Sequence, residues 1–223
     1  SATISAASKE NVLNSPINIS IENFDIKNIA ALANSDTLLA SGIVNAKFSL
    51  SEFDKKLPAF TGDAEISKLE FQQQPVGTIK LFAQKQDDNT ISATVDLTEN
   101  GNAVNIKGNY FLNNDQKQFE AGLNINRLSM ATLQTFSKGN LTRSSGNING
   151  NISLQGKFSD PRWNGALNFD TTQFTIAKLG TIYTLDKQKI NLTYPEISFN
   201  NFTIKDSTNN SLKVDGRITS KTI

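Results

Sequence analysis

The sequence contains no cysteine and no histidine. Their absence removes the most common general base, every thiol nucleophile and the preferred ligands of transition metals. Lys and Arg number 22 against 21 Asp and Glu, so the net charge of +1 supplies no field that would attract a polyanion. We therefore expect neither a metal site nor a nucleic-acid partner.

Long apolar runs are also absent. The longest covers residues 29–33, far below the roughly 20 residues that a membrane-spanning helix needs. We identify neither a membrane anchor nor a signal peptide, and because the sequence does not begin with Met, we expect a fragment of a longer protein. None of the nucleophile-elbow, P-loop or GxGxxG templates occurs. The sequence predicts no catalytic residue, no cofactor and no enzymatic activity, although two carboxylates brought together by folding would reopen glycosidase chemistry.

Alternation of apolar and polar residues dominates the chain. Ile17, Ile19 and Ile21 form one such run, and Leu212 and Val214 belong to another. The intervening positions carry Asn, Ser, Thr, Lys and Asp, so each strand has one side that water can solvate. Turn-forming clusters of Asn, Asp and Gly separate the runs. This pattern predicts an all-β protein of about 14 strands.

Two stretches depart from this alternation and show helical spacing. They cover residues 25–34 and 129–138, and Asp25 and Ser129 are suitable N-cap residues. A shift of about 104 residues superimposes the first stretch and the strand after it on the second. We therefore divide the chain into a lead-in over residues 1–16, expected to be disordered, and two β repeat units over residues 17–120 and 121–223, stacked continuously.

The repeated apolar faces allow two interpretations. In a closed sandwich or barrel, they would interdigitate as a dry core, which is the usual outcome of such a pattern. In an open, one-dimensional stack of repeats, they would form a continuous apolar trough with a polar exterior. Periodicity alone does not distinguish a core from a trough.

Short motifs follow one another in a fixed order in the second unit. A G-x-I-x-G run, an L-x-G step and a P-x-x-x-G-x-L run lie within residues 145–167, and Phe174, Tyr183 and residues 197–206 follow. In order and spacing, these elements resemble the TamB family, over roughly residues 17–219. The first unit carries a weaker copy, in which Ala46 replaces the glycine found at position 150.

This resemblance implies a large periplasmic protein of double-membraned bacteria, anchored in the inner membrane. The repeats of the family form a β-taco, an elongated U-shaped sheet with an apolar concave groove. The family belongs with AsmA-like proteins, which are associated with phospholipid transfer between the two membranes, and it is linked to an Omp85-type outer-membrane barrel. The fragment is expected to be monomeric and to bind phospholipid acyl chains. The groove lining would then consist of Ile66, Phe71, Val104, Ile106, Ile152, Leu154, Leu167, Phe169, Phe174, Ile176, Leu192, Phe199, Phe202, Ile204, Leu212 and Val214.

Two other functions remain open on the sequence. The chain could be a scaffold that holds unfolded strands of an outer-membrane client by strand addition. It could also be an adhesin or sugar-binding module, which predicts two closed sandwiches with exposed aromatic rings at Phe60 and Trp163.

Overall fold

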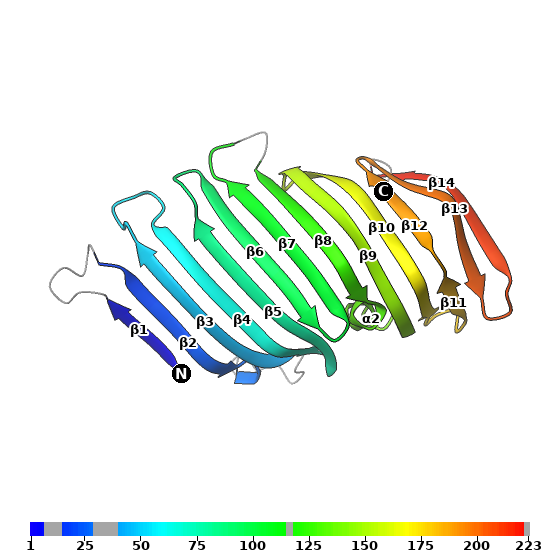
Figure 1. The fold of residues 1–223 in the computed structure, drawn as a ribbon, viewed down its shortest axis with the longest axis horizontal. Coiled ribbons are helices and arrows are strands. Elements are labelled where there is room, and N and C mark those ends of the chain that lie inside the picture. Colours follow the sequence, from blue (N-terminus) through cyan, green and yellow to red (C-terminus); the bar gives the residue numbers. More distant parts are fainter. Residues whose placement is uncertain (7–14, 29–39, 115–117, 221–223) are drawn as a thin grey trace.

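The computed structural model describes residues 1–6, 15–28, 40–114 and 118–220. These residues form one 14-stranded sheet, and Figure 1 shows its strands side by side. The strands are β1 (Ala2–Ala6), β2 (Ile17–Asp25), β3 (Ala40–Ser51), β4 (Ala59–Phe71), β5 (Gln74–Lys85), β6 (Thr90–Glu99), β7 (Asn102–Phe111), β8 (Phe119–Ser129), β9 (Leu141–Lys157), β10 (Asp160–Ile176), β11 (Ile182–Leu185), β12 (Gln188–Thr193), β13 (Glu196–Asp206) and β14 (Ser211–Thr219).

From β1 to β10, each strand pairs antiparallel with the next one in the sequence. β11 and β12 both pair with β10 on one side and with β13 on the other, so together they occupy one position in the sheet. β14 completes the sheet by pairing with β13. Because the strands are consecutive, short hairpin turns make most of the connections.

The turn between β6 and β7 illustrates how the sequence sets these hairpins. Asn100 and Gly101 both have positive φ, 46° and 81°, and the flanking residues Glu99 and Asn102 are paired across the strands. An Asn-Gly pair with both residues at positive φ makes a two-residue turn whose twist matches that of the sheet.

One helix, α2 (Met130–Phe136), connects β8 to β9 at the lower edge of the sheet in Figure 1. The Ser129 hydroxyl accepts a hydrogen bond from the backbone N–H of Ala131 over 3.2 Å and caps the helix. Asn102 is 5% exposed and fastens the helix to the sheet. Its amide nitrogen donates to the Val76 carbonyl and to the Thr132 hydroxyl, both over 2.8 Å, and its amide oxygen accepts from the Ser129 N–H over 2.9 Å.

The all-β class and the expected number of strands are confirmed. The helix predicted over residues 129–138 is present as α2, with Ser129 as its cap. The other predicted helix, over residues 25–34, falls largely outside the described residues, although the Asp25 carboxylate does accept from the Lys27 N–H over 2.9 Å. Within the lead-in, for which disorder was expected, Ala2–Ala6 forms β1. This alternating run is short and ends in alanines, so its sequence signal is weak.

Candidate functional site

The cross-strand register gathers the alternating apolar residues on one side of the sheet, which we call the apolar face. Val44 on β3 lies opposite Ile66 on β4, which in turn lies opposite Ile79 on β5. Because residues directly opposite one another in a ladder point to the same side, these pairs trace a continuous apolar row across the strands. The same holds farther along, where Ile106 on β7 lies opposite Leu123 on β8.

All the residues predicted to line a groove lie on this face. Most follow directly from the ladder pairs, and Phe174 and Ile176 share a surface hollow with Ile204 and Leu212. Phe71 lies at the end of β4, where its ring stacks on Phe136 of α2 with 5.0 Å between the ring centres. The residues so placed are Ile66, Phe71, Val104, Ile106, Ile152, Leu154, Leu167, Phe169, Phe174, Ile176, Leu192, Phe199, Phe202, Ile204, Leu212 and Val214.

Aromatic rings pack against one another on the apolar face of the last strands. Phe202 makes edge-on contacts with Phe169 and Phe199, with ring centres 6.0 and 5.5 Å apart. Farther up β10, Trp163 makes a similar contact with Tyr194 at 5.0 Å. Such contacts stabilise neighbouring strands and leave a surface made of ring edges and aliphatic carbon.

The apolar face is open to solvent. A compact protein of this size exposes about 10,000 Å², whereas this chain exposes 14137 Å². Ile106 remains 38% exposed and Leu212 62% exposed, and few large apolar side chains among the described residues are fully buried. The described strands therefore form a single layer, and the two closed sandwiches of the adhesin alternative are not observed. Phe60 and Trp163 are half-buried.

The opposite side, the polar face, is held together by cross-strand hydrogen bonds and ion pairs. Asn105 donates its amide to the Asp96 carboxylate over 2.6 Å, and Asn168 donates to the amide oxygen of Asn149 over 3.0 Å. Lys80 pairs with Glu65 at 3.4 Å. The Lys80 and Glu65 side chains are both exposed, so their ion pair fixes register more than it adds stability.

A row of β-bulges crosses the lower part of the sheet, a feature that the alternation of apolar and polar residues does not predict. In a regular strand, residues on the same face are two positions apart, with one residue between them. In β2, β4, β8 and β13, one such pair has two residues between its members. The pairs are Ile21 and Phe24, Ile66 and Leu69, Ile125 and Leu128, and Phe199 and Phe202. A further shift follows Asp170 in β10. These strands run in the same direction, and the ladder register places their bulges at similar heights in the sheet, whereas β6 between β4 and β8 is regular. The i, i+3 spacing of apolar residues inside otherwise alternating runs was the available signal.

Side chains of neighbouring strands accept hydrogen bonds from the bulged backbone. Asn23 and Asn201 both have φ near 50°. The N–H of Asn23 donates to the Asn45 side chain over 2.9 Å, and the N–H of Asn201 donates to the Asp215 carboxylate over 2.5 Å. A bulge removes an amide from the ladder, and these acceptors replace the lost partner. The bulges are therefore built-in features of the sheet.

A hollow of about 400 Å³ indents the apolar face near the ends of β10, β11 and β13. Its walls are mainly apolar and include Phe174, Ile176 and Leu179, with the Asp206 carboxylate on one side. The pKa of Asp206 is lowered chiefly by the hydrogen bond from the Asn210 side chain and further by those from Thr208, so this group remains an anion in neutral solution. The hollow has the size and the mainly apolar lining to receive a small apolar group.

The described residues hold no cluster of acidic side chains suited to a metal ion. No helix among them has the length and hydrophobicity to cross a bilayer. Besides Asp206, pKa shifts are found in two turns: a hydrogen bond from Lys85 lowers the pKa of Asp88, and the bond that Tyr194 donates to Asp160 raises the pKa of the phenol. The polar groups thus shape turns, and the candidate site is the apolar face.

A family model described as TamB, N-terminal domain matches residues 8–169, nearly three quarters of the chain. No curated protein and no solved structure shows significant similarity to the chain.

Proposed function

The chain belongs to the TamB family, and on this basis we propose that it is a periplasmic segment of a bridge that carries phospholipids between the inner and outer membranes. The observation that supports this role most directly is the open apolar face, which the ladder pairs trace across the sheet. A soluble monomer rarely exposes an apolar surface of this extent unless something binds there.

The energetics of lipid transfer explain why such a face is useful. Two acyl chains of about 16 carbons each, exposed to water at about 0.8 kcal/mol per CH₂, would cost about 25 kcal/mol. An apolar face that receives the chains removes most of this barrier while the headgroup stays in solvent. No residue needs to act chemically, and the chain requires no cofactor for this role.

The aligned bulges support a groove that runs across the strands. A bulge bends its strand, and bulges in a row bend the sheet along a single line. The line runs in the direction in which strands are added. With 14 strands at about 4.8 Å spacing, the fragment would contribute a trough of about 60 Å.

The proposal is tested by placing a photo-crosslinking amino acid at Ile106 or at Lys107. These neighbours on β7 lie on opposite faces of the sheet, and both are exposed, so neither substitution removes a buried side chain. The full-length protein is irradiated in cells grown with labelled phosphate. We expect labelled phospholipid to be attached at position 106 and not at position 107.

Two results would contradict the proposal. One is equal labelling at both positions, which would indicate nonspecific contact with membranes. The other is no labelling at position 106 in a protein that remains folded and whose crosslinker reacts with a test hydrocarbon.

The edge of the sheet favours a second candidate, a scaffold that assembles outer-membrane proteins with an Omp85-type barrel. All five residues of β1 are exposed, and within the described part of the chain β1 pairs with β2 alone. An unpaired strand edge is a template for an added strand. We expect a synthetic outer-membrane β-hairpin to bind the intact protein and binding to be lost in Ile4→Pro, which disrupts pairing at this edge. Equal binding by both proteins would exclude β1 as the site.

A further inference from the structure

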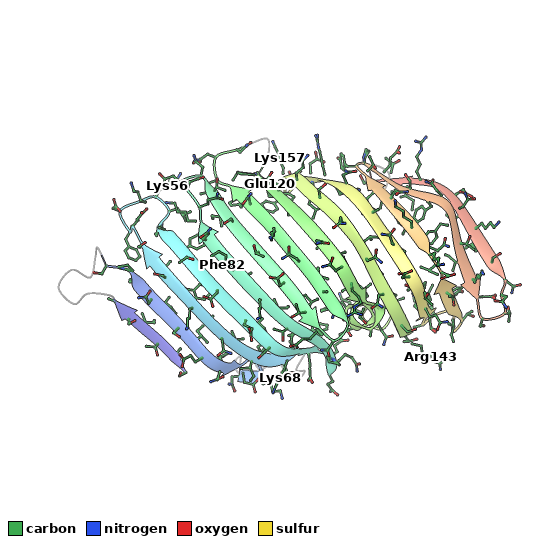
Figure 2. The ribbon with its side chains drawn as sticks, viewed as in Figure 1. Lys56, Lys68, Phe82, Glu120, Arg143 and Lys157 are labelled. Carbon is green, nitrogen blue, oxygen red and sulfur yellow. The ribbon has the colours of Figure 1, made fainter. Side chains whose placement is uncertain are left out.

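The charged residues of the chain are unevenly distributed along the two edges of the sheet. Residues 121–159 contain four cationic side chains and no carboxylate. Three of the four, Arg127, Lys138 and Arg143, lie near α2 at the lower edge, where Figure 2 labels Arg143 and also Lys68. Acids occur elsewhere on the lower edge, and the turns of the upper edge also mix cations with acids, as in the Lys85 and Asp88 pair at 2.8 Å.

Backbone contacts bring two separate turns together at this edge. The N–H of Ala177 donates to the carbonyl of Asn140 over 2.9 Å, and Ile176 pairs with Leu141. Lys178 follows Ala177 in the sequence, and Asn140 lies two residues after Lys138. The bond between Ala177 and Asn140 therefore brings the segments that carry Lys178 and Lys138 together. We call Phe136, Lys138, Arg143, Lys178 and Leu179 the basic corner. All five are exposed, and none of the three cations has a carboxylate partner among the described residues.

Two of these cations occupy unfavourable backbone conformations. Lys138 and Arg143 each have φ of 52°, a region that Gly and Asn adopt more readily. Lys68, on the same edge, has the same φ. Positive φ also occurs at the uncharged residues Gln72 and Thr171, so it marks the turns and bulges of the sheet and not the charge.

The basic corner adjoins the apolar hollow. Leu179 forms part of the wall of the hollow and follows Lys178 in the turn after β10. Leu179 is 60% exposed and Phe136 is 52% exposed. Cations beside a hollow that accepts hydrocarbon match the two parts of a glycerophospholipid, an anionic phosphate and its acyl chains.

The carboxylates on the same edge are engaged elsewhere. Glu70 accepts from the Ser41 hydroxyl over 2.9 Å, and Glu99 accepts from the Thr78 hydroxyl over 2.8 Å. Asp206 accepts from the side chain and N–H of Asn210, both over 2.9 Å. These acids are therefore engaged by their own neighbours rather than by the cations of the basic corner.

From this arrangement we infer that the basic corner holds the phosphate of a phospholipid whose acyl chains lie in the adjacent hollow. This inference rests on the proposed function and adds a position for the headgroup: phosphates follow the edge of the sheet at α2, and the upper edge remains free of them. The corner would favour anionic lipids over neutral ones of equal chain length.

The experiment compares two photoactivatable lipids with the same acyl chains, phosphatidylglycerol and diacylglycerol, on the intact protein. The wild-type protein should crosslink phosphatidylglycerol more efficiently by about 10- to 100-fold at low salt, since each cation near a lipid phosphate contributes roughly fivefold. Sodium chloride at high concentration should remove this preference, because it screens exposed charges. The triple variant K138Q/R143Q/K178Q should lose the preference and keep diacylglycerol labelling.

The matched control is K55Q/K56Q/K157Q, which removes the same charge from the upper edge, where Figure 2 shows Lys56 and Lys157. This control should retain the preference. If both triple variants behave alike, or if the wild-type protein labels the two lipids equally, the inference is wrong while lipid carriage stands. If the wild-type protein labels neither lipid, the proposed function itself fails.

Discussion

A lysine substituted at two positions on the apolar face should have very different effects if that face is open. Ile106 on β7 is 38% exposed, whereas Ile125 on β8 is 6% exposed. Complete burial of an isoleucine stabilises a fold by about 1.5–3 kcal/mol, so Ile106→Lys should cost about 1–2 kcal/mol, because the lysine ammonium can reach water. Ile125→Lys leaves an unpaired charge in a buried position and should cost several kcal/mol.

The assay is urea unfolding at neutral pH, followed by the fluorescence of Trp163 and by circular dichroism. Since domains of this kind have a total stability of about 5–15 kcal/mol, Ile106→Lys should stay folded and Ile125→Lys should be largely or wholly unfolded. Ile106→Met and Ile125→Met control for the change in shape and should each cost less than about 1.5 kcal/mol. Equal, large losses for the two lysine variants would refute the open face and restore a closed core.

Three further predictions concern the sheet and its edges. Gly165→Ala should lower the free energy of unfolding by about 1–3 kcal/mol, because the new Cβ would lie 2.1 Å from the Asn151 carbonyl oxygen. The control Gly122→Ala, whose new Cβ would meet nothing within 4 Å, should change the free energy of unfolding by less than about 0.5 kcal/mol. Urea titrations measure both values. Asn102→Leu should release α2, seen as faster hydrogen exchange of its amides while the strands stay protected. The hydrogen bonds to the Asp206 carboxylate should persist at any pH above its ordinary pKa of 3.8. They should be lost only as the pH falls through the lower pKa that Asp206 has in the folded protein, so the Asn210 amide signal should titrate with a midpoint below 3.8. A midpoint at or above that value would contradict the assignment.

The strands could be predicted from the sequence because each carries its own evidence. Ile17, Ile19 and Ile21 alternate with polar residues, and this alone places them on one face of a strand. The capping serine of α2 was likewise visible, since Ser129 precedes a helical spacing of apolar residues. Features of this kind depend on residues close together in the sequence.

Other features depend on contacts that the sequence does not reveal. The exposure of Ile106 differs from that of Ile125 although both belong to similar alternating runs, because exposure is decided by what lies above the sheet. In the basic corner, the turn that carries Lys138 meets the turn that carries Lys178. The contact is the hydrogen bond from the Ala177 N–H to the Asn140 carbonyl, which joins residues 37 positions apart in the sequence. The i, i+3 spacing of Ile66 and Leu69, or of Phe199 and Phe202, indicates a bulge at each of these places. Their alignment across the sheet could be recognised only once the strand directions and register were known.

The neighbour-to-neighbour pairing of the strands makes the length of the molecule independent of its cross-section. β5 bonds to β4 and β6 and needs nothing from β10 or β14. A hairpin inserted between two existing hairpins would lengthen the sheet by about 10 Å and leave the profile on either side unchanged. Evolution could therefore fit such a protein to compartments of different width by duplicating hairpins, with the contacts inside each hairpin left as they were.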